Sequence, residues 1–265
     1  MGRRLGQHFL HDASVAQRIV QLAAIGPDDQ VLEIGGGRGA LTEHLAELGA
    51  RRVVVELDDA LADLLATRYG ARIELVRADV LDVALADLGG ARRWVVLGNL
   101  PYYATSPILL WLCRQWRCVD RALVMMQAEV AQRLTAVPRT KEYGRLTLAT
   151  ALRARAATVL RVKPGSFSPP PAVLSAVVRL AFRAEPAEDV GDDARFEGLV
   201  AAGFRYRRKT VAAAMALGLP ASLAMADGWL TAAGIAARAR AEDLTLADWA
   251  RLARVVQSDG QEAGP

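Results

Sequence analysis

Short apolar runs alternate with amphipathic stretches over the first two thirds of the chain. The runs are typical of buried strands, and we expect strands at residues 31–34, 52–57, 73–76, 94–97, 123–126, 159–162 and 175–182. Helical spacing of apolar positions predicts helices at 15–24, 59–68, 106–118, 127–134 and 145–153. Because strands and helices alternate, the pattern favours an α/β fold with a parallel, doubly wound sheet.

The last third of the chain has a different character. Residues 183–195 are polar, acidic and rich in turn formers, and residues 196–256 have a helical pattern throughout. We therefore expect a sheet domain with an N-terminal arm at 1–185 and a small all-helical domain at 186–265. No apolar run approaches the roughly 20 residues of a membrane span, and no cleavable signal is recognisable, so we expect a cytoplasmic protein without membrane contact.

Composition adds two limits to this picture. Hydrophobic residues make up 52% of the chain and charged residues 23%, which is typical of a folded protein with a well-buried core. The two cysteines, Cys113 and Cys118, have no second pair or nearby histidines, so neither a disulfide framework nor a metal site is expected.

Acidic side chains stand at the ends of the first three expected strands, the edge where ligands bind in open α/β sheets. Glu33 precedes a glycine-rich turn at 35–40, Glu56 ends the second strand, and Asp79 follows the third. The glycine spacing also fits a dinucleotide fold. However, Glu33 would repel a pyrophosphate, whereas a sulfonium and an ammonium would welcome it. We therefore favour S-adenosylmethionine as the cofactor, with Asp79 as a partner for its adenine amino group.

The fourth expected strand leads into Asn99-Leu100-Pro101-Tyr102. An adenine N6 amino group is a poor nucleophile because its lone pair is delocalised into the ring. The Asn99 side-chain oxygen and a backbone carbonyl of Leu100 or Pro101 could accept hydrogen bonds from the two N–H groups of this amine and so pyramidalise the nitrogen. Tyr102 could stack on one face of the base, and Phe167, in a proline-rich loop, could cover the other. The stretch predicts a clamp for an adenine amino group.

The net charge of +4 is unevenly distributed. Residues 114–163 hold 11 Lys and Arg against 3 Asp and Glu, and residues 204–209 interleave aromatic rings with cations. Such stretches are either solvated helix faces or surfaces that bind a polyanion. We favour RNA binding, and the candidate residues are Arg133, Arg139, Lys141, Arg145, Arg205, Arg207, Arg208 and Lys209.

In this order, the motifs resemble those of the small-subunit ribosomal RNA adenine N6-dimethyltransferase family over nearly the whole chain. The resemblance is carried by Gly6-Gln7-His8-Phe9-Leu10, Glu33-Ile34-Gly35, Glu56-Leu57-Asp58, Asn99-Leu100-Pro101-Tyr102, Phe167-Ser168-Pro169-Pro170-Pro171 and Arg207-Arg208-Lys209-Thr210. It implies a class I S-adenosylmethionine-dependent methyltransferase fold, Rossmann-like, with a mostly parallel seven-stranded sheet. It also implies dimethylation of two adjacent adenines near the 3′ end of small-subunit rRNA, in an immature 30S-type subunit.

The resemblance further implies which residues surround the methyl donor: Gln7, His8, Leu10, Gly35, Glu56, Asp79 and Asn99. Glu56 would hold the ribose hydroxyls and Asp79 the adenine amino group. To these we add Glu33 and Gly37 from the glycine-rich turn. We expect the protein to act as a monomer.

Three departures from the family pattern bear on the cofactor and the substrate. His8 stands where the family usually has Asn. Ala172-Val173-Leu174 has lost the two charges of Lys-Val-Asp, and Ala212-Ala213-Ala214 stands where an Asn is usual. We expect the last two changes to lie on an RNA-facing surface, where they would affect substrate choice.

Two alternative functions remain open from the sequence. One is a large-subunit rRNA dimethyltransferase of the macrolide-resistance type, and the other is a ribosome-assembly factor that has lost catalysis. A DNA adenine methyltransferase is less favoured because its clamp typically carries Asp or Asn before Pro-Pro-Tyr.

Overall fold

The computed structural model describes residues 7–90 and 92–262, and the chain divides into two compact units. The first unit comprises the described residues up to Gln132 together with Arg153–Ala184. The second comprises Arg133–Leu152 and the described residues from Glu185 onward. Arg3 and Arg4 of the expected N-terminal arm lie outside the described residues.

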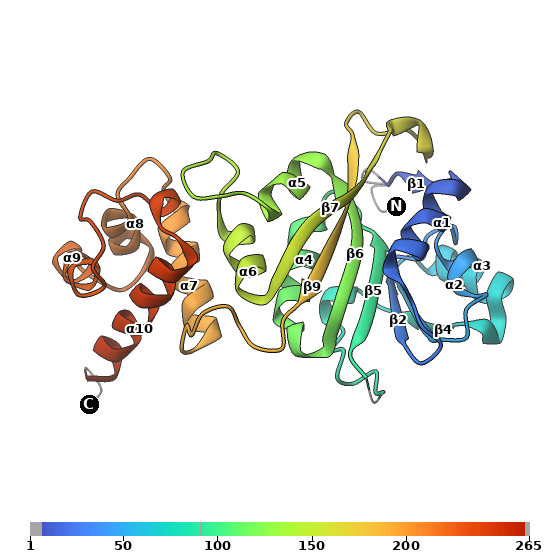
Figure 1. Ribbon diagram of the computed structural model, residues 1–265, viewed down its shortest axis with the longest axis horizontal. Coiled ribbons are helices and arrows are strands. Elements are labelled where there is room, and N and C mark those ends of the chain that lie inside the picture. The colour runs from blue at the N-terminus through green and yellow to red at the C-terminus, as the bar shows by residue number, and fades with distance from the viewer. Residues whose placement is uncertain (1–6, 91, 263–265) are drawn as a thin grey trace. The chain divides into compact units, whose positions relative to one another are not determined.

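The first unit is built on a seven-stranded sheet (Figure 1). In spatial order its strands are β4 (Glu74–Arg77), β3 (Arg51–Glu56), β2 (Gln30–Ile34), β5 (Trp94–Asn99), β6 (Val119–Gln127), β9 (Ser175–Phe182) and β7 (Ala154–Val162). The first five are parallel, and β9 runs antiparallel to both of its neighbours. The mostly parallel, seven-stranded sheet expected from the sequence is therefore confirmed.

The strand at the β7 edge is longer than its sequence predicts. It begins at Ala154, whereas the apolar run that indicated it begins at Val159. β7 lies at the edge of the sheet and pairs with β9 alone, so most of its residues are exposed or half-buried. Such residues need not be apolar, and the sequence therefore shows no continuous apolar run over the whole strand.

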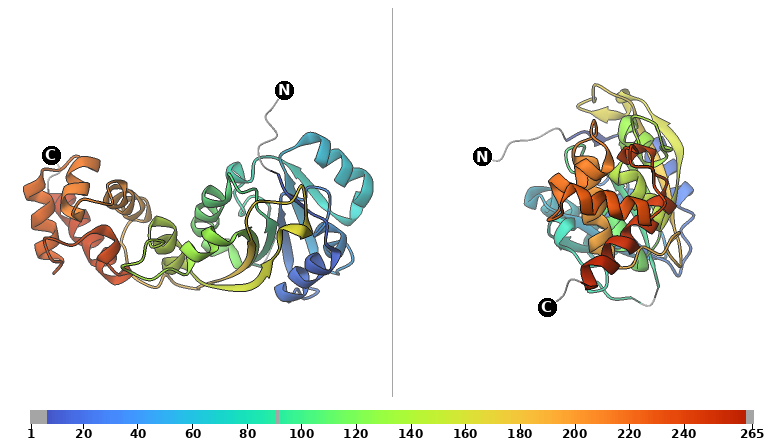
Figure 2. Two further views of the ribbon diagram at one scale, coloured as in Figure 1. Left: turned by 90° about the horizontal axis from the view of Figure 1, so that it is seen from above. Right: turned by 90° about the vertical axis from the view of Figure 1, so that its left-hand side faces the viewer.

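Helices cover both faces of this sheet (Figure 2). Val95 and Leu97 of β5 share a buried cluster with Ile19 of α1 (Ala13–Ala23), while Val54 of β3 packs against Leu65 of α3 (Asp59–Tyr69). Strands buried on both faces have near-continuous apolar sequences, which is why the central ones were easily recognised. The other helices of the unit are α2 (Thr42–Leu45) and α4 (Thr105–Arg114).

A separate two-stranded ladder ties the start of the described chain to the proline-rich loop. In it β1 (Phe9–Leu10) pairs antiparallel with β8 (Phe167–Ser168), with Leu10 opposite Phe167. The His11 backbone N–H continues the pairing by donating to the Ser166 carbonyl at 3.0 Å. This ladder fixes the N-terminal arm beside the carboxyl ends of the central strands.

The second unit is helical, as the sequence predicted for the end of the chain. Its helices are α7 (Asp193–Arg205), α8 (Val211–Gly218), α9 (Leu223–Ala232) and α10 (Leu246–Glu262), and α6 (Arg145–Arg153) belongs to it up to Leu152. α5 (Ala128–Leu134) spans the sequence boundary at Gln132. No helix within residues 7–90 and 92–262 is long and apolar enough to cross a membrane.

Residues 133–152 join the second unit, whereas the sequence placed them in a domain ending at 185. The reason lies in the helical core. Tyr143 and Leu148 are buried with Trp249 and Met215, and the Tyr143 hydroxyl donates to the Leu244 carbonyl at 2.8 Å. These contacts join residues about 100 positions apart. The domain boundary was predicted from the polar composition of residues 183–195, which carries no information about such distant contacts.

Candidate active site

A cavity of about 390 Å³ opens at the carboxyl ends of β2, β3 and β5. Its volume is in the range of small-molecule sites. Its lining includes most of the predicted cofactor and catalytic residues: Gln7, His8, Gly35, Glu56, Asp79, Asn99, Leu100, Pro101 and Tyr102. The structure thus brings together residues from the N-terminal arm and from four successive strand ends.

Two carboxylates are presented at neighbouring strand ends of this cavity. Glu56 is buried, and its oxygens accept hydrogen bonds from the backbone N–H groups of Gly37 at 2.8 Å and Asp58 at 3.0 Å. Asp79 Oδ1 accepts from the Leu81 N–H at 2.9 Å. Their remaining lone pairs are acceptors suited to hydroxyls and an exocyclic amino group. Val80 and Ile108 supply apolar surface in the same cavity, so this donor set fits the adenosine part of S-adenosylmethionine.

Gly35 forms part of the cavity wall with a φ of +70°, a conformation that favours glycine. The next residue, Gly36, packs closely on the sheet, because a Cβ there would lie 2.7 Å from Val54 Cγ1. Gly37 does not line the cavity and acts through its N–H bond to Glu56. The turn therefore brings backbone, rather than side chains, to the ligand.

Glu33 and Leu10 were predicted to surround the cofactor, but neither lines the main cavity. Both line a small crevice that shares Gly35 and Asn99 with the cavity. Glu33 is 2% exposed and accepts a 2.7 Å hydrogen bond from the Thr42 hydroxyl. Burial raises the pKa of Glu33 to about 7, the negative charge of Glu56 adds to this, and the Thr42 bond opposes it.

The Asn99 side chain is oriented by the N-terminal arm. Its Nδ2 donates to the His8 carbonyl at 3.0 Å, and His8 Nδ1 is 2.7 Å from the Pro169 carbonyl oxygen. A carbonyl oxygen only accepts, so His8 donates from Nδ1. With its amide nitrogen held in this way, Asn99 keeps Oδ1 as an acceptor, and no described residue donates to it.

The two backbone carbonyls of the clamp differ in availability. The Pro101 carbonyl accepts from the Ala104 N–H and from the Thr105 hydroxyl, both at 3.0 Å. The Leu100 carbonyl accepts no hydrogen bond from the part of the chain that the structure describes. Of the two carbonyls that the sequence left open, that of Leu100 is therefore the one available to a ligand.

Two tyrosines stand at the cavity. The half-buried Tyr102 shares a 2.6 Å hydrogen bond with the Ser175 hydroxyl, and its ring centroid lies 5.2 Å from that of His8. Burial raises the pKa of Tyr102, so its hydroxyl stays protonated at neutral pH. Tyr103 also lines the cavity and is 60% exposed. Tyr103 was not among the predicted site residues, although a second aromatic residue directly after Tyr102 was a visible signal.

Phe167 does not cover the cavity, and this prediction requires correction. It is 2% exposed and packs in the core cluster with Leu10, its partner in the β1–β8 ladder. Pairing with the N-terminal arm turns the ring inward. The prolines that follow it lie in a loop, as expected, and that loop offers the Pro169 carbonyl to His8 rather than an aromatic wall to a base.

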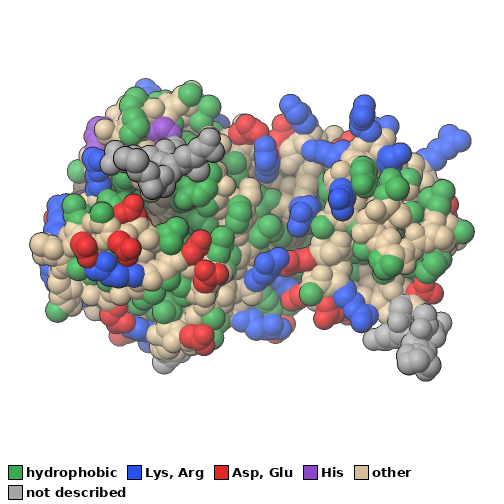
Figure 3. Space-filling view, turned by 180° about the vertical axis from the view of Figure 1, so that it is seen from behind, with side chains coloured by type: hydrophobic (Ala, Val, Ile, Leu, Met, Phe, Trp, Pro, Cys, Tyr) green, Lys and Arg blue, Asp and Glu red, His purple; other side chains and the backbone are tan. Residues whose placement is uncertain are grey.

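All the candidate RNA-binding residues lie in the second unit. All eight are exposed. Arg207 is paired with Glu242 at 2.9 Å, and Arg139 lies 3.7 Å from Asp243. Arg145 and Arg205 line one groove together with Phe204. Figure 3 shows Lys and Arg side chains along one edge of this unit.

The basic stretch at 114–163 is not one surface, because its parts belong to different units. Arg153 is 5% exposed and stacks on Trp116, and Arg121 pairs with Asp29 at 2.8 Å. These cations stabilise the first unit. The alanines at 212–214 also differ from expectation, since Ala212 and Ala214 are buried in the helical core and do not face RNA. Val173 and Leu174 are about half exposed, as expected for a surface loop.

Comparison with known proteins finds matches over nearly the whole chain. A sequence model of the family "Ribosomal RNA adenine dimethylase" matches residues 2–258. "Ribosomal RNA small subunit methyltransferase A" of Anaeromyxobacter dehalogenans is 43% identical, over 95% of this chain and 92% of that protein. The protein of the same name from Geobacter metallireducens is 39% identical, over 97% and 96%.

Two solved structures are similar over almost their whole length. The 23S rRNA methyltransferase ErmE is 29% identical with a TM-score of 0.64, and the alignment covers 94% of this chain and 99% of that one. A dimethyladenosine transferase from Plasmodium falciparum is 24% identical with a TM-score of 0.75, covering 96% and 98%. The second likeness supports the fold.

Proposed function

The chain belongs to the ribosomal RNA adenine dimethylase family, and we propose that it dimethylates N6 of two adjacent adenines near the 3′ end of small-subunit rRNA. It is a methyltransferase that uses S-adenosylmethionine. The relatives named for the small subunit are 43% and 39% identical, whereas the large-subunit enzyme ErmE is 29% identical. This difference favours the small-subunit substrate over the macrolide-resistance alternative.

When bound, S-adenosylmethionine supplies an electrophilic methyl group on its sulfonium. The protein's own residues then have three tasks. Glu56 and Asp79 hold the ribose hydroxyls and the adenine amino group of the donor. Asn99 Oδ1 and the Leu100 carbonyl accept hydrogen bonds from the two N–H groups of the target amine. These two hydrogen bonds orient the amine so that its lone pair faces the methyl group. Tyr102 stacks on the target base. Catalysis is thus mainly positioning and electrostatics.

The observation that carries this proposal is the hydrogen bond from Asn99 Nδ2 to the His8 carbonyl. It determines which end of the amide is available to a substrate. An amide turned the other way would present N–H donors, which suit a carbonyl and repel an amine. With Nδ2 engaged, the site offers two acceptors, the number an adenine amino group requires.

We further propose that the protein acts as a monomer in the cytoplasm on an immature 30S-type subunit. This step rests on the family resemblance and on the need for an unpaired adenine, since the target base must leave any duplex to reach the cavity. The exposed cations of the second unit would contact phosphates of the same rRNA.

Methyl transfer to isolated substrates tests the proposal. The protein is incubated with labelled S-adenosylmethionine and either immature small subunits, large subunits, naked rRNA or duplex DNA. We expect label in two adjacent adenines of small-subunit rRNA. Label confined to large subunits would replace this function with the macrolide-resistance type. No label in any substrate would favour an assembly factor without catalysis.

The groove of the second unit allows a test of RNA binding. Each phosphate contact contributes about 0.7 to 0.9 to the slope of log affinity against log salt. Replacing Arg145 and Arg205 together by Gln should therefore lower the slope by about 1.5, measured by fluorescence anisotropy with small-subunit rRNA. Arg251→Gln is the matched control, because Arg251 is already paired with Asp248. An unchanged slope in the double variant would mean that the groove is only a solvated face.

A further inference from the structure

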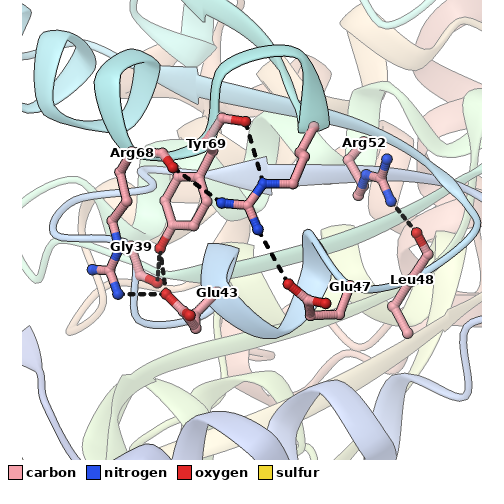
Figure 4. A network of polar contacts seen from close by, with 8 residues as sticks. Gly39, Glu43, Glu47, Leu48, Arg52, Arg68 and Tyr69 are labelled. Carbon is pink, nitrogen blue, oxygen red and sulfur yellow. Dashed lines mark hydrogen bonds and ion pairs between the residues drawn. The ribbon is translucent and has the colours of Figure 1, made fainter.

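Arg38, in the glycine-rich turn, carries a positive charge that the described residues do not neutralise. Its guanidinium lies over the Phe9 ring, 4.6 Å from the centroid, and makes no hydrogen bond or ion pair with a described residue. Nearby Arg68 differs, because it pairs with Glu43, whose carboxylate also accepts from the Tyr69 hydroxyl at 3.0 Å (Figure 4). The stacking on Phe9 holds the guanidinium in place while leaving its donors available.

The position of Arg38 links it to the methyl-donor cavity. It lines the small crevice that also contains Glu33, and this crevice shares Phe9, Gly35 and Asn99 with the main cavity. The crevice therefore extends the cavity past the glycine-rich turn. Its volume is only about 30 Å³, so it suits a compact polar group and excludes a ring.

The charges around the crevice are of opposite sign. Glu33 supplies a buried carboxyl, and Arg38 supplies an exposed cation. A free α-amino acid end, with one ammonium and one carboxylate, matches this pair, and the methionine end of the proposed donor is such a group. The planar guanidinium offers paired N–H donors with the spacing of two carboxylate oxygens.

We propose that Arg38 binds the α-carboxylate of the donor's methionine end. This inference rests on the proposed function, because it assumes that the cavity holds S-adenosylmethionine. It assigns a role to a residue that neither the clamp nor the acids at the strand ends require. It also accounts for an arginine that stacks on an aromatic ring instead of pairing with one of the acids nearby.

Two ligands that differ in the amino-acid end test this assignment by isothermal titration calorimetry. S-adenosylhomocysteine carries the carboxylate, whereas 5′-methylthioadenosine lacks the whole amino-acid end. We expect Arg38→Gln to raise the Kd of S-adenosylhomocysteine about tenfold, equal to about 1.4 kcal/mol, and to leave the Kd of 5′-methylthioadenosine unchanged. Arg68→Gln, which removes one nearby charge already paired with Glu43, should change neither Kd.

Several results would overturn the assignment, and they are distinguishable. Equal losses for both ligands would mean that Arg38 only supports the shape of the turn. Unchanged S-adenosylhomocysteine affinity in Arg38→Gln, with weaker binding of rRNA, would assign the guanidinium to an RNA phosphate. Wild-type protein that bound neither ligand would overturn the proposed function and this inference with it. The thermal midpoint of each variant shows whether it remains folded.

Discussion

Replacing Asn99 by alanine is expected to lower the rate of methyl transfer about 10² to 10³-fold, the usual cost of losing one preorganised polar group at a reacting centre. The variant loses the Oδ1 acceptor, so one N–H bond of the target amine is no longer held and its lone pair stays in conjugation with the ring. Donor affinity should change by less than about threefold, because Glu56 and Asp79 are untouched. Single-turnover methyl transfer and calorimetry with S-adenosylhomocysteine measure the two effects separately.

A second substitution at the same position tests the orientation argument. Asn99→Asp retains an acceptor but cannot donate to the His8 carbonyl, and it places a carboxylate against that oxygen. We expect its rate to be lower than that of the wild type even though an acceptor remains. Asn99 is the only asparagine in the sequence. A wild-type single-turnover rate in Asn99→Ala would contradict the clamp.

The parts of the fold that the sequence predicted are those whose cause is local. β5 is recognisable because both of its faces are buried, and the acids at positions 56 and 79 were found because they stand at or just after strand ends. The β7 edge was predicted too short because half-buried residues carry no apolar run. Local patterns therefore identify the sheet and the edge at which the ligand binds.

The parts that the sequence missed depend on contacts between distant segments. Phe167 is turned into the core by Leu10, which lies more than 150 positions earlier in the chain. His8 is fixed by Pro169 over a similar separation, and Tyr143 by Leu244. None of these pairings changes the local pattern of apolar and polar residues. For this reason most of the site residues that the sequence named line the cavity, with Phe167 among the exceptions, but the contacts that orient them could not be predicted.

Replacing Glu33 by glutamine should change the dependence of stability on pH. The pKa of Glu33 is about 7 in the folded protein against 4.5 for an unperturbed glutamate, so the folded state binds the proton more tightly. Below pH 4.5 both states are protonated and the carboxyl carries no penalty. As the pH rises from 4.5 to 7, the unfolded state releases the proton first, and stability is lost. Above pH 7 the loss is complete and amounts to about 3 kcal/mol.

Glutamine removes this titration and still accepts the hydrogen bond from the Thr42 hydroxyl. The unfolding free energy of Glu33→Gln relative to wild type should therefore rise by about 3 kcal/mol between pH 4.5 and pH 8. Urea unfolding at a series of pH values measures this difference. Any effect of the amide that does not depend on pH is the same at every pH and therefore does not contribute to the rise. Glu47→Gln is the control, since the Glu47 side chain is 71% exposed. A pH-independent difference for Glu33→Gln would show that Glu33 is ionised at no cost in the fold. In that case Glu33 would already be stabilised as a carboxylate in the fold, and its burial would give no additional attraction for the ammonium group of the donor.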